Sequence, residues 1–176
     1  TCQWTVTGSG AMVLAKKGDF PKITYVTTGV VKDYGIKDPN NMGAAMAPAA
    51  VDTIYNHFKD TGRTPKDYDI IATGDLGKVG KEITTKLLLD YGYDVKDNYV
   101  DCGDLIFDDE RQKTDSGGSG CGCSAVVTCG YFYRKLLKRE IKSLLLVSTG
   151  ALMSTTSSLQ GESIPGIAHA VAIEYK

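Results

Sequence analysis

The sequence predicts an α/β domain, a layered, mixed five-stranded sheet with helices. Short apolar runs typical of strands alternate with longer segments in which apolar residues recur at helical spacing. This alternation favours a largely parallel sheet, because helical crossovers return the chain to the same end of the sheet. The chain closes on two adjacent strand-like segments, which predicts an antiparallel edge and therefore a mixed sheet.

Composition limits the class of protein. The 176 residues are 42% hydrophobic and 23% charged, which is enough for one domain with a core. The net charge is -1 and the two signs are interspersed, so no nucleic-acid partner is expected. No segment approaches the roughly 20 apolar residues of a membrane helix, and no signal peptide is visible. Because the chain starts at Thr1 without a methionine, we expect a fragment or a processed product.

The first third of the chain contains two strand-like segments and one helix. Residues 4–15 have β-rich composition, and residues 22–31 alternate as a second strand. Residues 38–41 contain a helix breaker followed by a helix cap. The predicted helix covers residues 42–58, and Pro48 inside it predicts a kink or a first turn near that proline.

The rest of the chain continues the alternation of strands and helices. Two polar segments, residues 108–119 and 154–161, are expected to be mostly loop. The strands expected are residues 68–73, a short one within 100–107, 143–147 and 168–175, and the helices are 79–89 and 121–137.

The cysteines and histidines predict neither a disulfide framework nor a metal site. An odd number of irregularly spaced cysteines fits reduced thiols in a cytosolic-type compartment. With only two histidines, no zinc constellation has convincing spacing, and no metal ligand is expected. His57, near the end of a predicted helix, is expected to have a surface or capping role. The cysteines are Cys2, Cys102, Cys121, Cys123 and Cys129.

The segment with the clearest chemical signal is residues 115–124, D-S-G-G-S-G-C-G-C-S, which we call the glycine segment. Glycines let the backbone approach a ligand closely, and the helix that follows would present free N–H groups at its start. That arrangement suits a carboxylate or a phosphate. The alternative, with equal weight, is tight packing of the helix start against the sheet. The P-loop pattern is absent, because no G-K-[ST] follows.

Other polar residues have both a ligand and a structural interpretation. Asp75 follows a buried strand at the edge where ligands of α/β sheets gather, although capping the next helix is favoured. Lys78 could meet an anion, but an exposed helix lysine is commoner. His169, which leads into the last strand, could contact a ligand or serve a structural role. The acidic residues between 101 and 110 lack EF-hand spacing and are expected to form a solvated loop.

Several segments resemble, in the same order, the second half of the thiolase superfamily. Residues 38–49 are similar to the thiolase segment D-P-x-x-M-G-x-G-P-x-x-A. Residues 69–76 fall where thiolases have the N-E-A-F strand end, and residues 118–125 fall on the G-H-P-x-G-A-S-G loop. Residues 165–174 fall on the final glycine-rich turn and strand. The resemblance implies that this chain is a thiolase-like half.

The departures from the thiolase pattern imply that the usual chemistry is lost. The loop histidine falls on Ser119, and the second cysteine falls near Glu162 or Ser163. The N-E pair of N-E-A-F falls on residues 73–74. A serine cannot replace the imidazole that activates a thiol, because its hydroxyl pKa is far too high. We therefore expect no enzyme and assign no catalytic residue.

Within that superfamily, the whole chain resembles the SpoVAD family of sporulation proteins. The stretches that carry this resemblance are T-x-Q-W-T-V-T-G-x-G-A, D-x-G-x-S-G-C-G-C-S-A and I-A-H-A-V-A-I-E. It implies a non-catalytic protein that binds dipicolinic acid and is needed for its uptake into the developing spore, with links to transport and germination. It also implies a peripheral location at the spore inner membrane alongside other SpoVA proteins. No cofactor is implied beyond calcium accompanying dipicolinate.

Members of that family have two similar halves. Residues 1–17 would be the last strand of the N-terminal half, and residues 18–176 the C-terminal thiolase-like domain. The N-terminal half is then an expected partner that completes a ligand pocket between the halves, and a homodimer remains open. Asp75 would oppose a bare dianion but not a calcium-bridged one. The expected ligand contacts are Asp75, Gly118, Ser119, Gly120, Cys121, Gly122, Cys123 and His169.

Two other functions remain as alternatives. The first is a thiolase-like acyltransferase with rearranged groups, which would use Cys121 or Cys123, since a thiol at a helix start can have a lowered pKa. The second is a purely structural subunit whose old pocket is filled by side chains.

Overall fold

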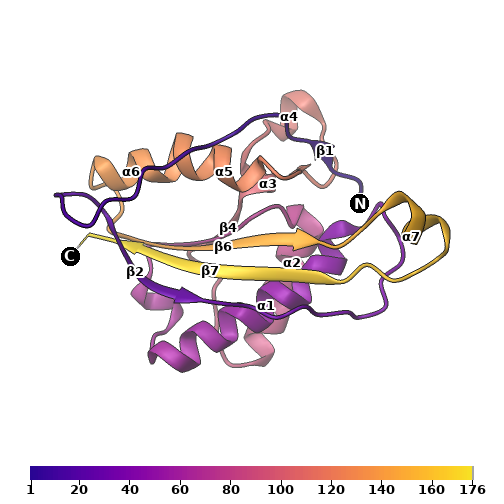
Figure 1. Ribbon diagram of the computed structural model, residues 1–176, viewed down its shortest axis with the longest axis horizontal. Coiled ribbons are helices and arrows are strands. Elements are labelled where there is room, and N and C mark those ends of the chain that lie inside the picture. Colours follow the sequence, from indigo (N-terminus) through magenta and orange to yellow (C-terminus); the bar gives the residue numbers. More distant parts are fainter. Residues whose placement is uncertain (176) are drawn as a thin grey trace.

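The computed structural model describes residues 1–175 and confirms the predicted mixed five-stranded sheet with helices. The strand order is β2-β7-β6-β3-β4 (Figure 1). Strands β6, β3 and β4 run parallel, and β7 is antiparallel to both of its neighbours. The final pair of strands is therefore antiparallel, as predicted, but the antiparallel edge strand is β2, which pairs with β7. The strands are β2 Lys22–Thr27, β3 Ile70–Thr73, β4 Tyr99–Asp101, β6 Ser143–Ala151 and β7 Gly166–Glu174.

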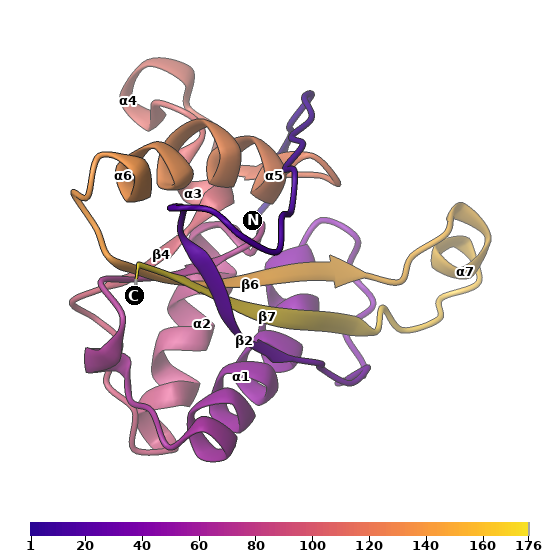
Figure 2. The same cartoon turned by 60° about the vertical axis from the view of Figure 1, so that its left-hand side comes forward.

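Helices cover both faces of the sheet, which gives three layers (Figure 2). On one face lie α1 (Met42–Thr61) and α2 (Gly77–Asp90), which share one apolar cluster with the sheet. On the other face α5 (Cys123–Val127), the π-helical turn η2 (Thr128–Phe132) and α6 (Tyr133–Leu137) form one uninterrupted helical run over a second cluster. None of the helices in residues 1–175 combines the length and apolarity needed to cross a bilayer.

The β-rich composition of residues 4–15 produces only one short strand. That strand, β1 (Trp4–Thr5), pairs in parallel with β5 (Gly118–Ser119), outside the main sheet. The chain after Thr5 runs beside α5 and η2 without strand pairing, and it leaves Val13 98% exposed. β-propensity did not suffice here, because a strand forms only against a partner. The division at residue 17 between an N-terminal half and a C-terminal domain stays a prediction.

Local differences from prediction concern helix ends and loops. Helix α1 runs through Pro48 and continues to Thr61, so the proline does not mark its first turn. Asn41 occupies the N-cap position, but its side chain makes no capping hydrogen bond. The expected loops contain single helical turns, and the remaining short elements are η1 Pro65–Asp67, α3 Cys102–Leu105, α4 Asp109–Gln112 and α7 Thr155–Leu159.

The prediction that His57 has a surface or capping role is wrong. Its side chain is fully buried on the inner face of α1. The Nδ1 atom lies 2.8 Å from the Thr27 hydroxyl, and Nε2 lies 2.6 Å from the Tyr68 hydroxyl. His57 lies inside α1, and its ring joins this helix to Thr27 of β2 and to Tyr68, two residues before β3. Both ring nitrogens have partners, as a buried imidazole requires.

This burial predicts a pH dependence of stability. Burial lowers the pKa of His57 from 6.5 to about 4, so the folded chain keeps the ring neutral while the unfolded chain takes up a proton below pH 6.5. The contribution of His57 to the free energy of unfolding should therefore fall as pH drops from 6.5 to 4, by at most about 3 kcal/mol. His57→Gln should remove this contribution. Urea unfolding at several pH values measures it.

The matched control is His169→Gln, because the exposed His169 is the other histidine of the sequence. This variant should keep the wild-type pH dependence of stability.

Burial also raises the pKa of Asp101 to about 6, which makes the Asp101 contribution change with pH in the opposite direction below that pH. The difference between wild type and His57→Gln therefore isolates the contribution of His57. Equal slopes for the His57→Gln variant and wild type would contradict the assignment.

Candidate functional site

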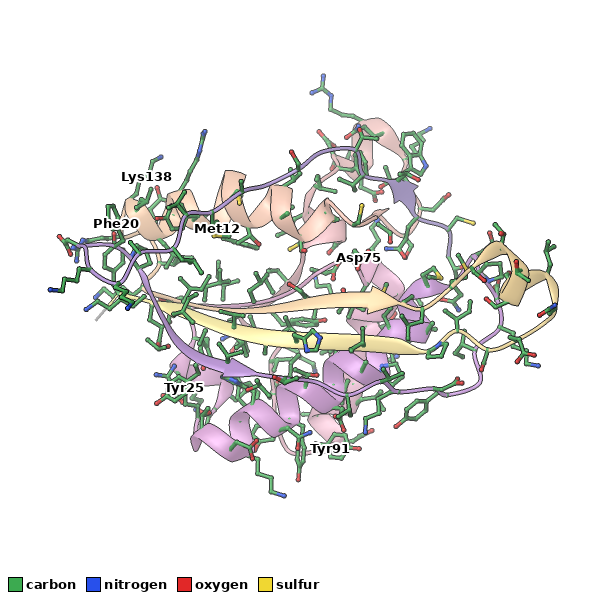
Figure 3. All side chains as sticks on the ribbon, viewed as in Figure 1. Met12, Phe20, Tyr25, Asp75, Tyr91 and Lys138 are labelled. Atoms are coloured by element: carbon green, nitrogen blue, oxygen red, sulfur yellow. The ribbon has the colours of Figure 1, made fainter. Side chains whose placement is uncertain are left out.

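The carboxylate of Asp75 joins three parts of the chain at the carboxyl end of β3. One oxygen accepts the Thr149 hydroxyl at 2.7 Å. The other accepts the Ser119 hydroxyl at 2.7 Å and the Gly120 N–H at 3.0 Å. Asp75 is only 8% exposed and lies between β6 and the layer that contains α5 (Figure 3). The structure thus brings together three of the predicted site residues, Asp75, Ser119 and Gly120.

The favoured prediction that Asp75 caps the next helix is wrong, because Asp101 performs that role. Its carboxylate accepts the N–H groups of Leu76 at 2.9 Å and Gly77 at 2.8 Å, at the start of α2. It also accepts the N–H of Gly103 at 2.9 Å, at the start of α3. Asp101 is fully buried, so the prediction of a solvated acidic loop is wrong for this residue.

The start of the α5–η2–α6 helical run keeps free hydrogen-bond donors. The Cys123 N–H donates to the Gly120 carbonyl at 2.9 Å. Among residues 1–175, no hydrogen bond reaches the N–H groups of Cys121, Gly122 or Ser124. Free N–H groups at the start of a long helix carry partial positive charge and accept anions. The arrangement can therefore hold a carboxylate or a phosphate oxygen.

The glycines of this segment are also required for packing. A Cβ atom on Gly122 would lie 2.2 Å from the Gly8 carbonyl oxygen. A Cβ atom on Gly118 would lie 2.7 Å from the side chain of Val6. Gly120 has a φ of +140°, which other residues rarely adopt. Tight packing thus explains these glycines as well, and the partner is the amino-terminal segment rather than the sheet.

The two cysteines of the glycine segment have different environments. Cys121 is exposed, whereas Cys123 is fully buried. Burial, together with the nearby Asp75 carboxylate, raises the pKa of the Cys123 thiol to about 12. The acyltransferase alternative expected a lowered thiol pKa, and for Cys123 that prediction is wrong. A buried thiol with a raised pKa is a poor nucleophile.

The side chains of His169 and Lys78, two other residues considered as ligand contacts, have partners outside the glycine segment. His169 is exposed on β7, and its Nδ1 accepts the Gly29 N–H at 3.1 Å. In the described part of the chain, no hydrogen bond or ring contact links His169 to the glycine segment. Lys78 pairs with Asp109 at 2.5 Å on the surface, as the structural alternative expected.

Two surface grooves, one along α2 and one beside η2, lie away from the eight predicted contacts, none of which lines either groove. No group of three or more His, Cys, Asp or Glu side chains in this range is arranged to hold a metal ion.

Comparison with known proteins decides the family. Residues 1–174 match the model of the family described as Stage V sporulation protein AD (SpoVAD). This chain belongs to the SpoVAD family. A curated relative, Stage V sporulation protein AD of Bacillus subtilis (strain 168), is 49% identical over 174 residues, 99% of this chain and 51% of the relative. The chain thus spans about half the length of the curated SpoVAD relative that it matches.

Solved structures similar to this SpoVAD-family chain include a human thiolase. Human mitochondrial 3-ketoacyl-CoA thiolase matches 86% of this chain and 30% of its own, with 16% identity and a TM-score of 0.40. The same enzyme in complex with CoA matches the same shares, with 16% identity and a TM-score of 0.39.

Sequence reasoning missed two residues that contact the candidate site. Thr149, at the carboxyl end of β6, binds the Asp75 carboxylate. Gln3 donates through Nε2 to the carbonyl oxygens of Asp75 and Gly118, both at 2.9 Å. Thr149 could have been found, because polar residues that follow neighbouring parallel strands meet at one edge of the sheet. The sequence carries no comparable signal for Gln3.

Proposed function

We propose that this SpoVAD-family chain is part of a non-catalytic protein that binds dipicolinic acid, with or without calcium, and is needed for its uptake into the developing spore. The observation that supports the proposal is the set of free N–H groups at Cys121, Gly122 and Ser124. Dipicolinate is a planar aromatic dianion, and its carboxylates suit such donors. The N-terminal half would supply the other wall of the pocket, and other SpoVA proteins at the inner membrane would be its partners.

The charge of Asp75 does not exclude an anion from this position. Each of its oxygens already accepts a hydrogen bond, from Thr149, Ser119 and Gly120. These bonds offset part of the negative charge of the carboxylate, which lies at the Gly120 N–H, next to the free donors. A calcium ion bound to dipicolinate would reduce the remaining repulsion.

The absence of catalysis is supported by two side chains. Ser119 stands where the thiolase resemblance places an imidazole, and its hydroxyl donates to Asp75 rather than activating a thiol. Cys123 is buried with a raised pKa. The acyltransferase alternative is left with Cys121, which is exposed at the helix start.

Titration calorimetry with dipicolinate tests the proposal on the full-length protein. We expect a saturable heat for the wild type and for Cys121→Ala, which keeps the backbone N–H. Cys121→Pro removes that N–H and should weaken binding roughly tenfold or more, because a hydrogen bond to a charged group contributes about 1.5–3 kcal/mol. Thermal melting shows whether the proline variant folds.

The outcomes separate the three functions. A wild type that gives no heat, with and without calcium, would overturn dipicolinate binding and favour a structural subunit. Equal affinity of the alanine and proline variants would overturn the role of the Cys121 N–H. A covalent acyl group on Cys121 after incubation with acyl-CoA, detected by mass spectrometry, would establish the acyltransferase instead.

A further inference from the structure

The Asp101 carboxylate accepts hydrogen bonds from five donors, two of which flank Asp75 in the chain. One oxygen accepts the Thr73 hydroxyl at 2.6 Å and the Leu76 N–H at 2.9 Å. The other accepts the N–H groups of Gly77, Gly103 and Asp104, the last at 3.2 Å. All five donors therefore depend on one buried acceptor group.

These contacts hold the chain on both sides of Asp75. Thr73 lies two residues before it, and Leu76 follows it directly. The turn between them has little rigidity of its own, because it contains Gly74 and leads into Gly77, whose φ is +63°. Fixing both ends of such a turn limits the directions in which the Asp75 side chain can point.

We infer that Asp101 is a positioning residue for the glycine segment: by fixing Thr73 and Leu76 it aims the Asp75 carboxylate, which in turn holds Ser119 and Gly120 just before α5. This inference rests on the proposed function of the glycine segment as the ligand site. Asp101 contacts no ligand in this scheme. It acts through Asp75, and its loss should loosen residues 118–124 without removing any of their donors.

Asp101→Asn is the direct test, because the amide keeps the size but replaces one acceptor oxygen with a donor. The milder Thr73→Val removes one of the five donors and covers the case in which Asp101→Asn does not fold. Asp69→Asn is the matched control. Asp69 also accepts several hydrogen bonds, from Lys142 and Ser143, but it lies at the opposite end of β3.

Hydrogen–deuterium exchange of residues 118–124 measures positioning without any ligand. Asp101→Asn and Asp75→Asn should each speed exchange there, roughly tenfold for Asp101→Asn, and Thr73→Val should do so less. Asp69→Asn should leave this segment unchanged even if it lowers the melting temperature. Unchanged exchange in Asp101→Asn, or equal acceleration by Asp69→Asn, would overturn the inference whether or not the wild type binds dipicolinate.

Dipicolinate affinity of the full-length protein then separates positioning from general stabilisation. If Asp101 acts through Asp75, the Asp75→Asn, Asp101→Asn double variant should bind no more weakly than Asp75→Asn alone. Additive losses would overturn action through Asp75. A wild type that gives no binding would refute the proposed function, while the exchange result still decides whether Asp101 positions the segment.

Discussion

Gly43→Ala is expected to lower the free energy of unfolding by about 3 kcal/mol, because α1 and α2 approach each other at this glycine. A Cβ atom at Gly43 would lie 2.3 Å from the Leu76 carbonyl oxygen and 2.9 Å from the Gly80 nitrogen. The contact is reciprocal, since a Cβ atom at Gly80 would lie 2.8 Å from the Gly43 carbonyl oxygen. These neighbours are backbone atoms and cannot rotate away, so the helices would have to separate. Urea unfolding at pH 7 measures the loss.

Gly130→Ala is the matched control for this prediction. Gly130 also lies within a helical segment, the turn η2, but a Cβ atom there would meet nothing within 4 Å. Alanine favours helix over glycine by up to about 1 kcal/mol, so this variant should be as stable as the wild type or more stable. Similar midpoints for Gly43→Ala and Gly130→Ala would show that the α1–α2 contact relaxes without cost.

The sheet could be predicted because its strands carry their own signals. Apolar runs such as Leu144, Leu145 and Leu146 indicate buried strands, and the helices between them follow from apolar spacing. Residues 4–15 show the limit of this reasoning, because their composition is strand-like but most of them have no strand partner in residues 1–175. Pairing depends on what lies beside a segment, and composition alone does not contain that information.

The site could be predicted only in part. The glycine segment and Asp75 were found, since their residue types and their positions after strands are visible in the sequence. The capping of α2 by Asp101 instead of Asp75 was not predicted. Either aspartate could cap a helix, and only the fold decides which one reaches the α2 N–H groups. His57 was misjudged for a similar reason, because its burial depends on which segments pack against its face of α1, and only the fold shows that Thr27 and Tyr68 lie there.

Arg63→Ala is expected to have the second large effect, about 3 kcal/mol, because it would remove two charge-assisted hydrogen bonds and the guanidinium charge from the buried Glu174 carboxylate. The guanidinium donates to both carboxylate oxygens, at 2.7 Å and 3.2 Å, and Glu174 is only 7% exposed. The Arg63 guanidinium carbon also lies 4.6 Å from the ring centre of Tyr25, and the Tyr25 side chain lies on the α1 side of β2 (Figure 3). Since Glu174 also accepts the Thr24 hydroxyl, the pair ties the end of α1 to the edge strand β2 and to β7.

Two further variants show whether geometry or charge carries this effect. Arg63→Lys keeps the charge but loses the planar, two-pronged contact, so it should recover only part of the lost stability. Lys86→Ala, which breaks the exposed pair with Glu82, should change stability by no more than about 0.5 kcal/mol. Urea unfolding of all three variants at pH 7 makes the comparison. Full recovery of stability in Arg63→Lys would mean that charge alone suffices. A loss of stability in Lys86→Ala as large as in Arg63→Ala would mean that burial of the ion pair adds nothing.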